Sequence, residues 1–171
     1  MVSDAGPQVE SWSEQLREAV ALRLPVLGVC YGHQLLAHAL GGVVTNHPGG
    51  LELGQIEIEM EIAAQDDPLF SVLPQRFSAY ASHLQSIHKL SPGAFIYGAN
   101  KFERQHAVRF APSAWGVQFH PEFNQKIMRA YIGYQRPRLK SDEEMHVLRD
   151  KVESLPEAGL LLQRFCQLVD N

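Results

Sequence analysis

The feature that most constrains the fold is a cysteine between two glycines, at the junction of two hydrophobic patterns. Residues 28–34 read Gly-Val-Cys-Tyr-Gly-His-Gln. The apolar residues 26–29 before the cysteine are typical of a strand buried on both faces, as in a parallel sheet. The spacing of apolar residues over 34–40 is typical of a helix. We therefore expect a strand, a sharp turn at Cys30 and a helix.

Such a turn suits a nucleophile. Gly28 and Gly32 would let neighbouring backbone approach without a Cβ clash. The N-terminal amides of the following helix would point at the sulfur and favour thiolate over thiol. The backbone N–H of Tyr31 would then point to where an oxyanion develops.

A second motif supplies the groups that such a thiol needs. Residues 117–123 read Val-Gln-Phe-His-Pro-Glu-Phe, an apolar strand that ends on a histidine. Pro121 favours extended backbone at His120. Glu122 could orient the imidazole through Nδ1, so that the other ring nitrogen faces the thiol. Cys30, His120 and Glu122 are the parts of a Cys-His-Glu nucleophilic site.

Each motif alone has a simpler interpretation. Free cysteine is commonly a small buried hydrophobe, which is one interpretation of Cys30 and the one we expect for Cys166. A lone histidine in an apolar segment is more often a hydrogen-bonded core residue than a catalyst. The two motifs together favour catalysis, provided that the fold brings them together.

Composition predicts one domain over residues 1–171 in a soluble, cytoplasmic protein. The net charge of −4 gives no overall attraction to nucleic acid or to an anionic membrane. Two cysteines fit a reducing compartment, and residues 1–6 do not resemble a secretory signal. No apolar run approaches the roughly 18–20 residues that span a bilayer.

The sequence predicts neither a metal nor a cofactor. No histidine pair has zinc-ligand spacing with support from cysteine or carboxylate; the histidines considered are His33, His38, His47 and His83. No phosphate-binding or dinucleotide-binding glycine pattern occurs.

Periodicity predicts the remaining elements. Residues 55–62 alternate isoleucine or methionine with glutamate, which indicates a half-buried, antiparallel strand. Residues 43–54 are expected to form a loop. The other expected elements are helices over 11–24, 33–40, from 124 (capped by Asn124), from 141 (with a capping box at Ser141) and over 156–169, and strands over 76–82, 94–98, 105–110 and 114–119.

In these residues the chain resembles the class I glutamine amidotransferases, which supply ammonia to biosynthetic synthetases. Residues 28–37 match the family's nucleophile motif, and residues 117–123 match its His-x-Glu motif. Residues 80–83, Tyr-Ala-Ser-His, look like the segment that lines the glutamine site. The resemblance runs to about residue 135 and is strongest to stand-alone proteins similar to the glutaminase domain of GMP synthase.

The resemblance implies a doubly wound α/β fold with a mostly parallel, flavodoxin-like sheet. It implies that Cys30 attacks the side-chain amide of glutamine, that His120 acts as base and that Glu122 orients it. A γ-glutamyl thioester would then be hydrolysed to glutamate after ammonia has left. Gln34 and the backbone of Ser82 and His83 would help to hold glutamine, and a synthetase partner would accept the ammonia.

One departure from the family concerns the N-terminal side of the elbow. Only 29 residues precede Cys30, and they contain one helical pattern and no convincing strand. Family members normally carry further strands there, and a glycine loop that supplies half of the oxyanion hole. We therefore expect an N-terminally truncated form whose first strands are missing, or a chain that relies on a partner. Loss of one oxyanion donor typically costs about 10²–10³ in rate.

Two alternatives to a glutaminase stay open on sequence. The same thiol chemistry serves a γ-glutamyl peptidase or hydrolase, whose specificity would reside in loops such as 43–54. An inactive, truncated domain that binds a partner would also fit. The sequence does not identify the ammonia acceptor or the oligomeric state.

Overall fold

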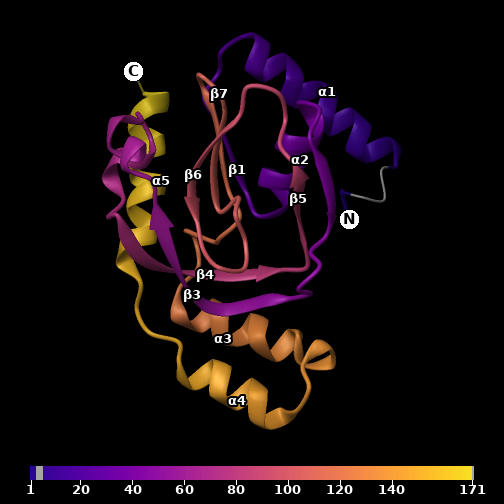
Figure 1. The fold of residues 1–171 in the computed structure, drawn as a ribbon, viewed down its shortest axis with the longest axis vertical. Coiled ribbons are helices and arrows are strands. Elements are labelled where there is room, and N and C mark those ends of the chain that lie inside the picture. Colours follow the sequence, from indigo (N-terminus) through magenta and orange to yellow (C-terminus); the bar gives the residue numbers. More distant parts are fainter. Residues whose placement is uncertain (3–5, 171) are drawn as a thin grey trace.

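The computed structural model describes residues 1–2 and 6–170, which form a mixed sheet with helices on both faces (Figure 1). The helices are α1 (Pro7–Ala21), α2 (Tyr31–Ala39), α3 (Gln125–Tyr134), α4 (Asp142–Asp150) and α5 (Pro156–Val169), with short 3₁₀ segments η2 (Ile62–Asp66), η3 (Phe70–Val72) and η4 (Arg136–Arg138). The strands are β1 (Val26–Val29), β2 (Val43–Asn46), β3 (Glu52–Met60), β4 (Arg76–His83), β5 (Gln85–Lys89), β6 (Phe95–Ala99), β7 (Ala107–Ala111) and β8 (Ala114–Val117). No helix in this described part combines the length and apolarity that a membrane crossing requires.

The main sheet has six strands in the order β1-β8-β7-β6-β3-β4, and β2 pairs with β5 in a separate ribbon. The predicted α/β class is confirmed. The pairing is more mixed than the expected, mostly parallel sheet, because only β1 and β8 run parallel among the strands described. Strands β6, β7 and β8 follow one another through short connections, which require antiparallel neighbours.

Two hydrophobic cores lie on opposite faces of this sheet. Along β7 and β8, neighbouring side chains alternate between the two cores, as the pleat requires. Helices α1 and α2 cover one core, and α5 covers the other (Figure 1). A third cluster beneath α3 and α4 contains Tyr80, Met128, Ile132 and Val152.

Strand β1 lies at one end of the sheet. It pairs with β8 on one side, and no described strand pairs with its other side. Its Val26, Leu27 and Val29 are half-buried rather than buried. The strand expected to be buried on both faces is thus half-buried, and among the described strands it pairs with β8.

The alternating pattern over 55–62 is correct for most of its length. Ile58 and Met60 are buried, and Glu57 and Glu59 are exposed on the opposite face of β3. Ile62 breaks the pattern, because the chain has already turned into η2, and its side chain is 73% exposed.

The expected loop over 43–54 is wrong at both ends. It contains β2, which pairs with β5, and the start of β3, which pairs with β4. Strand β5 was not expected either. Cys166, expected in the core, is exposed on α5.

Both expected helix caps are present. The Asn124 side chain accepts a hydrogen bond from the Ile127 N–H at 3.0 Å, and the Ser141 hydroxyl accepts one from the Glu144 N–H at 3.1 Å. The Glu144 carboxylate accepts from the N–H of Lys140 at 2.7 Å, one residue before the cap. In a standard capping box this carboxylate would accept from the N–H of the cap residue Ser141, so the second hydrogen bond of the box is shifted by one residue.

Gly28 is where β1 and α2 approach most closely. A Cβ at Gly28 would lie 2.6 Å from the backbone oxygen of Gly32 and 2.7 Å from the backbone nitrogen of His33. The steric reason predicted for glycine thus holds at this position. It is wrong for Gly32, where a Cβ would meet nothing within 4 Å.

We expect Gly28→Ala to lower the free energy of unfolding by about 3 kcal/mol, because backbone atoms cannot move aside as a side chain can. Gly32→Ala is the matched control. It should be neutral or stabilising by up to about 1 kcal/mol, because alanine is the better helix former. Urea denaturation of both variants measures the difference. Equal stabilities would contradict the close approach.

Candidate active site

Cys30 occupies a strained backbone position between β1 and α2. Its φ of 48° and ψ of −100° are rarely adopted by a residue with a side chain. Its N–H donates to the carbonyl of Val117 at 2.8 Å, which extends the β1–β8 pairing to the turn itself. Tyr31 is the first residue of α2, so helix geometry leaves its N–H without an intrahelical partner.

His120 and Glu122 form a hydrogen-bonded pair after β8. The imidazole Nδ1 donates to the Glu122 carboxylate at 2.7 Å, and the backbone N–H of His120 donates to the carbonyl of Tyr80 at 2.8 Å. Phe123 stacks on the imidazole, with ring centroids 3.9 Å apart and planes 15° apart. These contacts fix the ring's orientation and leave its Nε2 for another partner.

The structure brings Cys30, His120 and Glu122 together. Burial by itself lowers the pKa of His120, but hydrogen bonding and charge interactions with Cys30 and Glu122 outweigh this and raise the pKa to about 9. The imidazole is therefore held protonated, next to the sulfur, over the physiological pH range.

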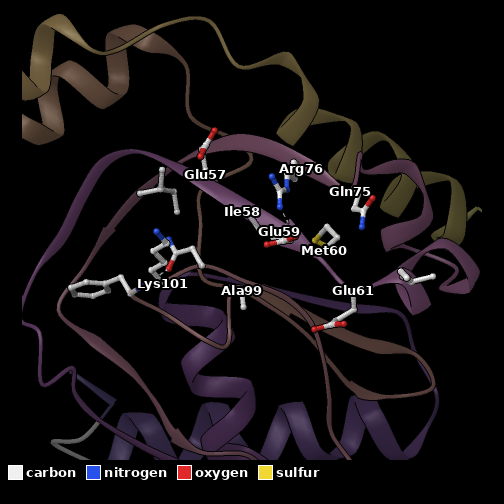
Figure 2. A pocket seen from close by; sticks show the side chains of 13 residues that line it. Glu57, Ile58, Glu59, Met60, Glu61, Gln75, Arg76, Ala99 and Lys101 are labelled. Carbon is white, nitrogen blue, oxygen red and sulfur yellow. Dashed lines mark hydrogen bonds and ion pairs between the residues drawn. The ribbon is translucent and has the colours of Figure 1, made fainter.

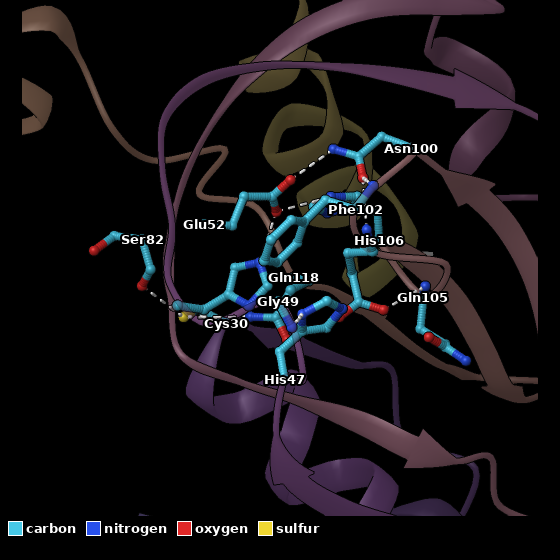
Figure 3. Close-up of polar contacts among 12 residues, drawn as sticks. Cys30, His47, Gly49, Glu52, Ser82, Asn100, Phe102, Gln105, His106 and Gln118 are labelled. Carbon is cyan, nitrogen blue, oxygen red and sulfur yellow. Dashed lines mark hydrogen bonds and ion pairs between the residues drawn. The ribbon is translucent and has the colours of Figure 1, made fainter. Parts of the chain in front are cut away.

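Two more groups contact the sulfur. The thiol donates to the carbonyl of Ser82 at 3.9 Å, and the side-chain amide of Gln118 donates to the sulfur at 3.6 Å (Figure 3). Gln118 is absent from the predicted site. Its spacing could have indicated it, because residues two apart on an extended segment share a face, and Gln118 precedes His120 by two.

Gln34, predicted to hold glutamine, uses its amide nitrogen inside the protein. That NH₂ group donates to the carbonyl of Gln85 at 2.6 Å and to Oε1 of Gln118 at 2.9 Å. The side-chain hydroxyl of Ser82 accepts from the Gln135 amide at 3.5 Å, while its carbonyl faces the thiol. A substrate role for Gln34 and Ser82 stays a prediction.

His83 belongs to a buried polar cluster that the sequence did not reveal. Its Nε2 lies 2.7 Å from Oε2 of Glu52, and its Nδ1 donates to the carbonyl of Gln85 at 3.0 Å. Oε2 of Glu52 also lies 3.2 Å from Nε2 of His106, and Oε1 accepts from Asn100 at 2.8 Å (Figure 3). Strand pairing explains the proximity of Glu52 and His83, which are register partners in β3 and β4.

Within the part of the chain described, Glu52, His83 and His106 are the set of three whose ligand atoms could approach one metal ion. Zinc ligands at about 2.0–2.1 Å from the ion in tetrahedral geometry lie about 3.3 Å apart. The 2.7 Å between Glu52 and His83 is shorter and fits a shared proton better than an ion. The prediction of no metal or cofactor stays a prediction.

The buried cluster contains a charged carboxylate, that of Glu52. Burial raises the pKa of Glu52, but hydrogen bonds from His106, His83 and Asn100 outweigh it and hold the pKa well below its usual range. Burial and the charge of His106 lower the pKa of the nearby His33 to about 3, so His33 is neutral. One buried carboxylate, ionised at neutral pH, thus lies in contact with two buried imidazoles.

A hollow of about 990 Å³ is lined by residues of β3, β6 and the segment after β6 (Figure 2). It opens between β3 and β6, which pair only at Glu59 and Met60 and then diverge. Its rim carries charges of both signs; the charged residues lining it are Glu57, Glu59, Glu61, Arg76 and Lys101. Neither Cys30 nor His120 lines it.

A thiol at a strand–helix turn of an α/β sheet, beside a hydrogen-bonded His–Glu pair, is an arrangement that suits nucleophilic catalysis by cysteine. The glutamine amidotransferase class-I family matches residues 4–134. The chain is 31% identical over 140 residues to a glutamine-hydrolyzing GMP synthase of Thermosipho africanus, covering 78% of this chain and 26% of that protein. The chain therefore belongs to the class I glutamine amidotransferase family.

A shorter relative is one of the subunits of the glutamine-hydrolyzing GMP synthase of Methanocaldococcus jannaschii. It is 32% identical over 123 residues, which cover 71% of this chain and 63% of that relative. The chain thus spans about a quarter of the first relative and under two thirds of the second.

Solved structures share the fold. A glutamine amidotransferase from Thermotoga maritima matches with a TM-score of 0.78 and 21% identity, over 95% of this chain and 70% of that one. A glutamine amidotransferase from Methylobacillus flagellatus matches with a TM-score of 0.71 and 23% identity, over 99% and 67%. This likeness shows the α/β fold that the resemblance implied.

We expect the imidazole of His120 to titrate near pH 9 when followed by NMR, and Glu122→Gln to lower that value by removing the carboxylate partner. Because folding raises the pKa above its ordinary 6.5, the protonated ring contributes stability below pH 6.5 that is lost as pH rises through about 9. Glu57→Gln, on the exposed face of β3, should leave the His120 titration unchanged. A titration of His120 near 6.5 would contradict the arrangement.

Glu52→Gln should lower the free energy of unfolding by about 3 kcal/mol at pH 7, because it removes the buried carboxylate that accepts hydrogen bonds from His83, His106 and Asn100. Glu57→Gln, five residues along the same strand but exposed, should change it by less than about 0.5 kcal/mol. Since folding depresses the pKa of Glu52, the difference from wild type should shrink as pH falls below 4.5. Denaturation at pH 7 and pH 4 measures this, and equal effects of the two substitutions would contradict it.

Proposed function

We propose that this chain is a glutaminase that hydrolyses the side-chain amide of glutamine to glutamate and ammonia. The observation that carries the proposal is that His120, hydrogen-bonded to Glu122, lies beside the sulfur of Cys30, and these two partners raise the pKa of the imidazole to about 9. An imidazolium beside a sulfur supports a thiolate nucleophile and supplies a proton to a leaving group. Membership of the class I family supports glutamine as the substrate.

In the first half-reaction, the Cys30 thiolate attacks the amide carbon, and a carbon–sulfur bond forms. The N–H of Tyr31 donates to the developing oxyanion. His120 gives its proton to the amide nitrogen, the carbon–nitrogen bond breaks and ammonia leaves. The products are a γ-glutamyl thioester and a neutral imidazole.

In the second half-reaction, His120 acts as base. It takes a proton from water as the water oxygen attacks the thioester carbon, while Glu122 stabilises the imidazolium that forms again. The carbon–sulfur bond breaks, Cys30 leaves as thiolate and glutamate is released. The Cys30 thiolate and the protonated His120 with which the proposed cycle began are restored.

The ammonia requires an acceptor. Both relatives described above are GMP synthases, and in one of them the matching part is a separate polypeptide. We propose that this chain likewise delivers ammonia to a synthetase carried on another domain or chain. Action in the cytoplasm stays a prediction from its two cysteines.

The test pairs activity with covalent trapping. Cys30→Ala should reduce glutamine hydrolysis by about 10⁴-fold or more, because no other group replaces the nucleophile. The glutamine-like electrophile 6-diazo-5-oxo-norleucine should label Cys30 once, as read by peptide mapping, and glutamine should protect against it. Cys166→Ala, at the exposed second thiol, is the matched control and should keep activity and labelling.

The outcomes separate the alternatives. Unchanged hydrolysis by Cys30→Ala would overturn the proposal. If glutamate is released faster from a γ-glutamyl dipeptide than from glutamine, the protein is a γ-glutamyl hydrolase instead. A folded protein that is neither labelled nor active would indicate a binding domain.

A further inference from the structure

A continuous chain of hydrogen bonds, buried as far as Gln118, ends on the sulfur of Cys30. It begins at the backbone carbonyl of Gln85, which accepts from the Gln34 amide nitrogen at 2.6 Å. The same nitrogen donates to Oε1 of Gln118 at 2.9 Å, and Nε2 of Gln118 donates to Sγ of Cys30 at 3.6 Å. Gln34 is 4% exposed and Gln118 is fully buried, so water does not compete for the two bonds of Gln34, whereas the bond to the sulfur is partly buried.

The first acceptor fixes the direction of every bond in this chain. A backbone carbonyl can only accept, so Gln34 must turn its NH₂ group, and not its oxygen, towards Gln85. That NH₂ group also faces Gln118, which must therefore present its oxygen. The NH₂ group of Gln118 is left facing the sulfur. Side-chain amides are often ambiguous in orientation, but here a main-chain atom determines it.

The carbonyl of Gln85 is itself held in place. It also accepts from Nδ1 of His83, whose Nε2 contacts the Glu52 carboxylate. The first acceptor of the chain is thus tied to the buried cluster between β3 and β4. Its position does not depend on a mobile surface group.

We propose that Gln118 is a further catalytic residue, whose side-chain N–H hydrogen-bonds the Cys30 sulfur and stabilises it as the thiolate. A neutral N–H that faces a sulfur stabilises negative charge on it and does not help the thiol form to the same degree. Gln118 and His120 both follow β8 but affect the sulfur differently. Gln118 donates a neutral hydrogen bond, whereas His120 supplies positive charge. The same bond stabilises the thiolate when it leaves the thioester. This last consequence rests on the proposed glutaminase function.

The test measures the thiolate directly. In a Cys166→Ala background, the rate of Cys30 alkylation by iodoacetamide is followed by intact mass from pH 4 to pH 10. Gln118→Met keeps the volume and removes the donor, and we expect the midpoint of the rate profile to rise by about one to two pH units. Gln118→Glu places an oxygen at the sulfur and should raise the midpoint at least as far. The groups that titrate near the sulfur, His120 and Glu122, are kept in both variants.

Two further variants sharpen the comparison. Gln34→Met leaves Gln118 in place but frees its amide to rotate, so it should raise the midpoint by less than Gln118→Met. Gln163→Met, on the exposed face of α5, is the matched control and should not shift it. Thermal melting and the alkylation rate at the high-pH plateau show whether each variant is folded and its thiol accessible.

Activity then separates this inference from the proposed function. If wild type hydrolyses glutamine, Gln118→Met should lower kcat/KM at pH 7 by roughly 10- to 100-fold. Unchanged alkylation midpoints in both folded Gln118 variants would overturn the inference, even if glutamine is hydrolysed. A raised midpoint in a protein that does not hydrolyse glutamine would support the thiolate contact and reject the glutaminase.

Discussion

The close approach of β1 and α2 at Gly28 is the constraint on which the site depends. With no Cβ at Gly28, the first turn of α2 sits 2.6–2.7 Å from where that atom would be. The chain can then pass from strand to helix within one residue, and Cys30 at that position adopts a strained backbone with a φ of 48°. The parallel pairing of β1 with β8 continues to this turn through the Cys30 N–H. Gln118 and His120, which follow directly after β8, therefore lie next to the same sulfur.

The sulfur is surrounded by groups of different kinds, each with a distinct physical origin. His120 contributes positive charge, which its partner Glu122 sustains by raising the imidazole pKa. Gln118 contributes a neutral donor whose direction is set by a backbone carbonyl two hydrogen bonds away. The carbonyl of Ser82 accepts from the thiol. Away from water such bonds are stronger, so the orientation of the Gln118 amide affects how strongly the thiolate form of Cys30 is favoured over the thiol.

The motifs near the thiol were readable because their chemistry is local in sequence. His120 and Glu122 are two residues apart in a turn that contains Pro121, and the Phe123 N–H donates to the His120 carbonyl at 3.4 Å. Glu52, His83 and His106 were not readable as a cluster, because they come from three segments that meet only through strand pairing. Strand β2 was missed for a similar reason: four residues in a glycine- and proline-rich stretch carry no periodicity, and only pairing with β5 orders them.

The sequence by itself determined the strand–turn–helix at Cys30, the helix caps, the alternating face of β3 and the family, because each depends on residues that are close in the chain. Tertiary structure alone decided that β1 pairs with β8, that Glu52 contacts two buried imidazoles and that Gln34 points its amide inward rather than outward. Those features depend on which distant atoms a polar group meets. A buried donor or acceptor must find a partner, and its identity is fixed only when the whole chain has packed.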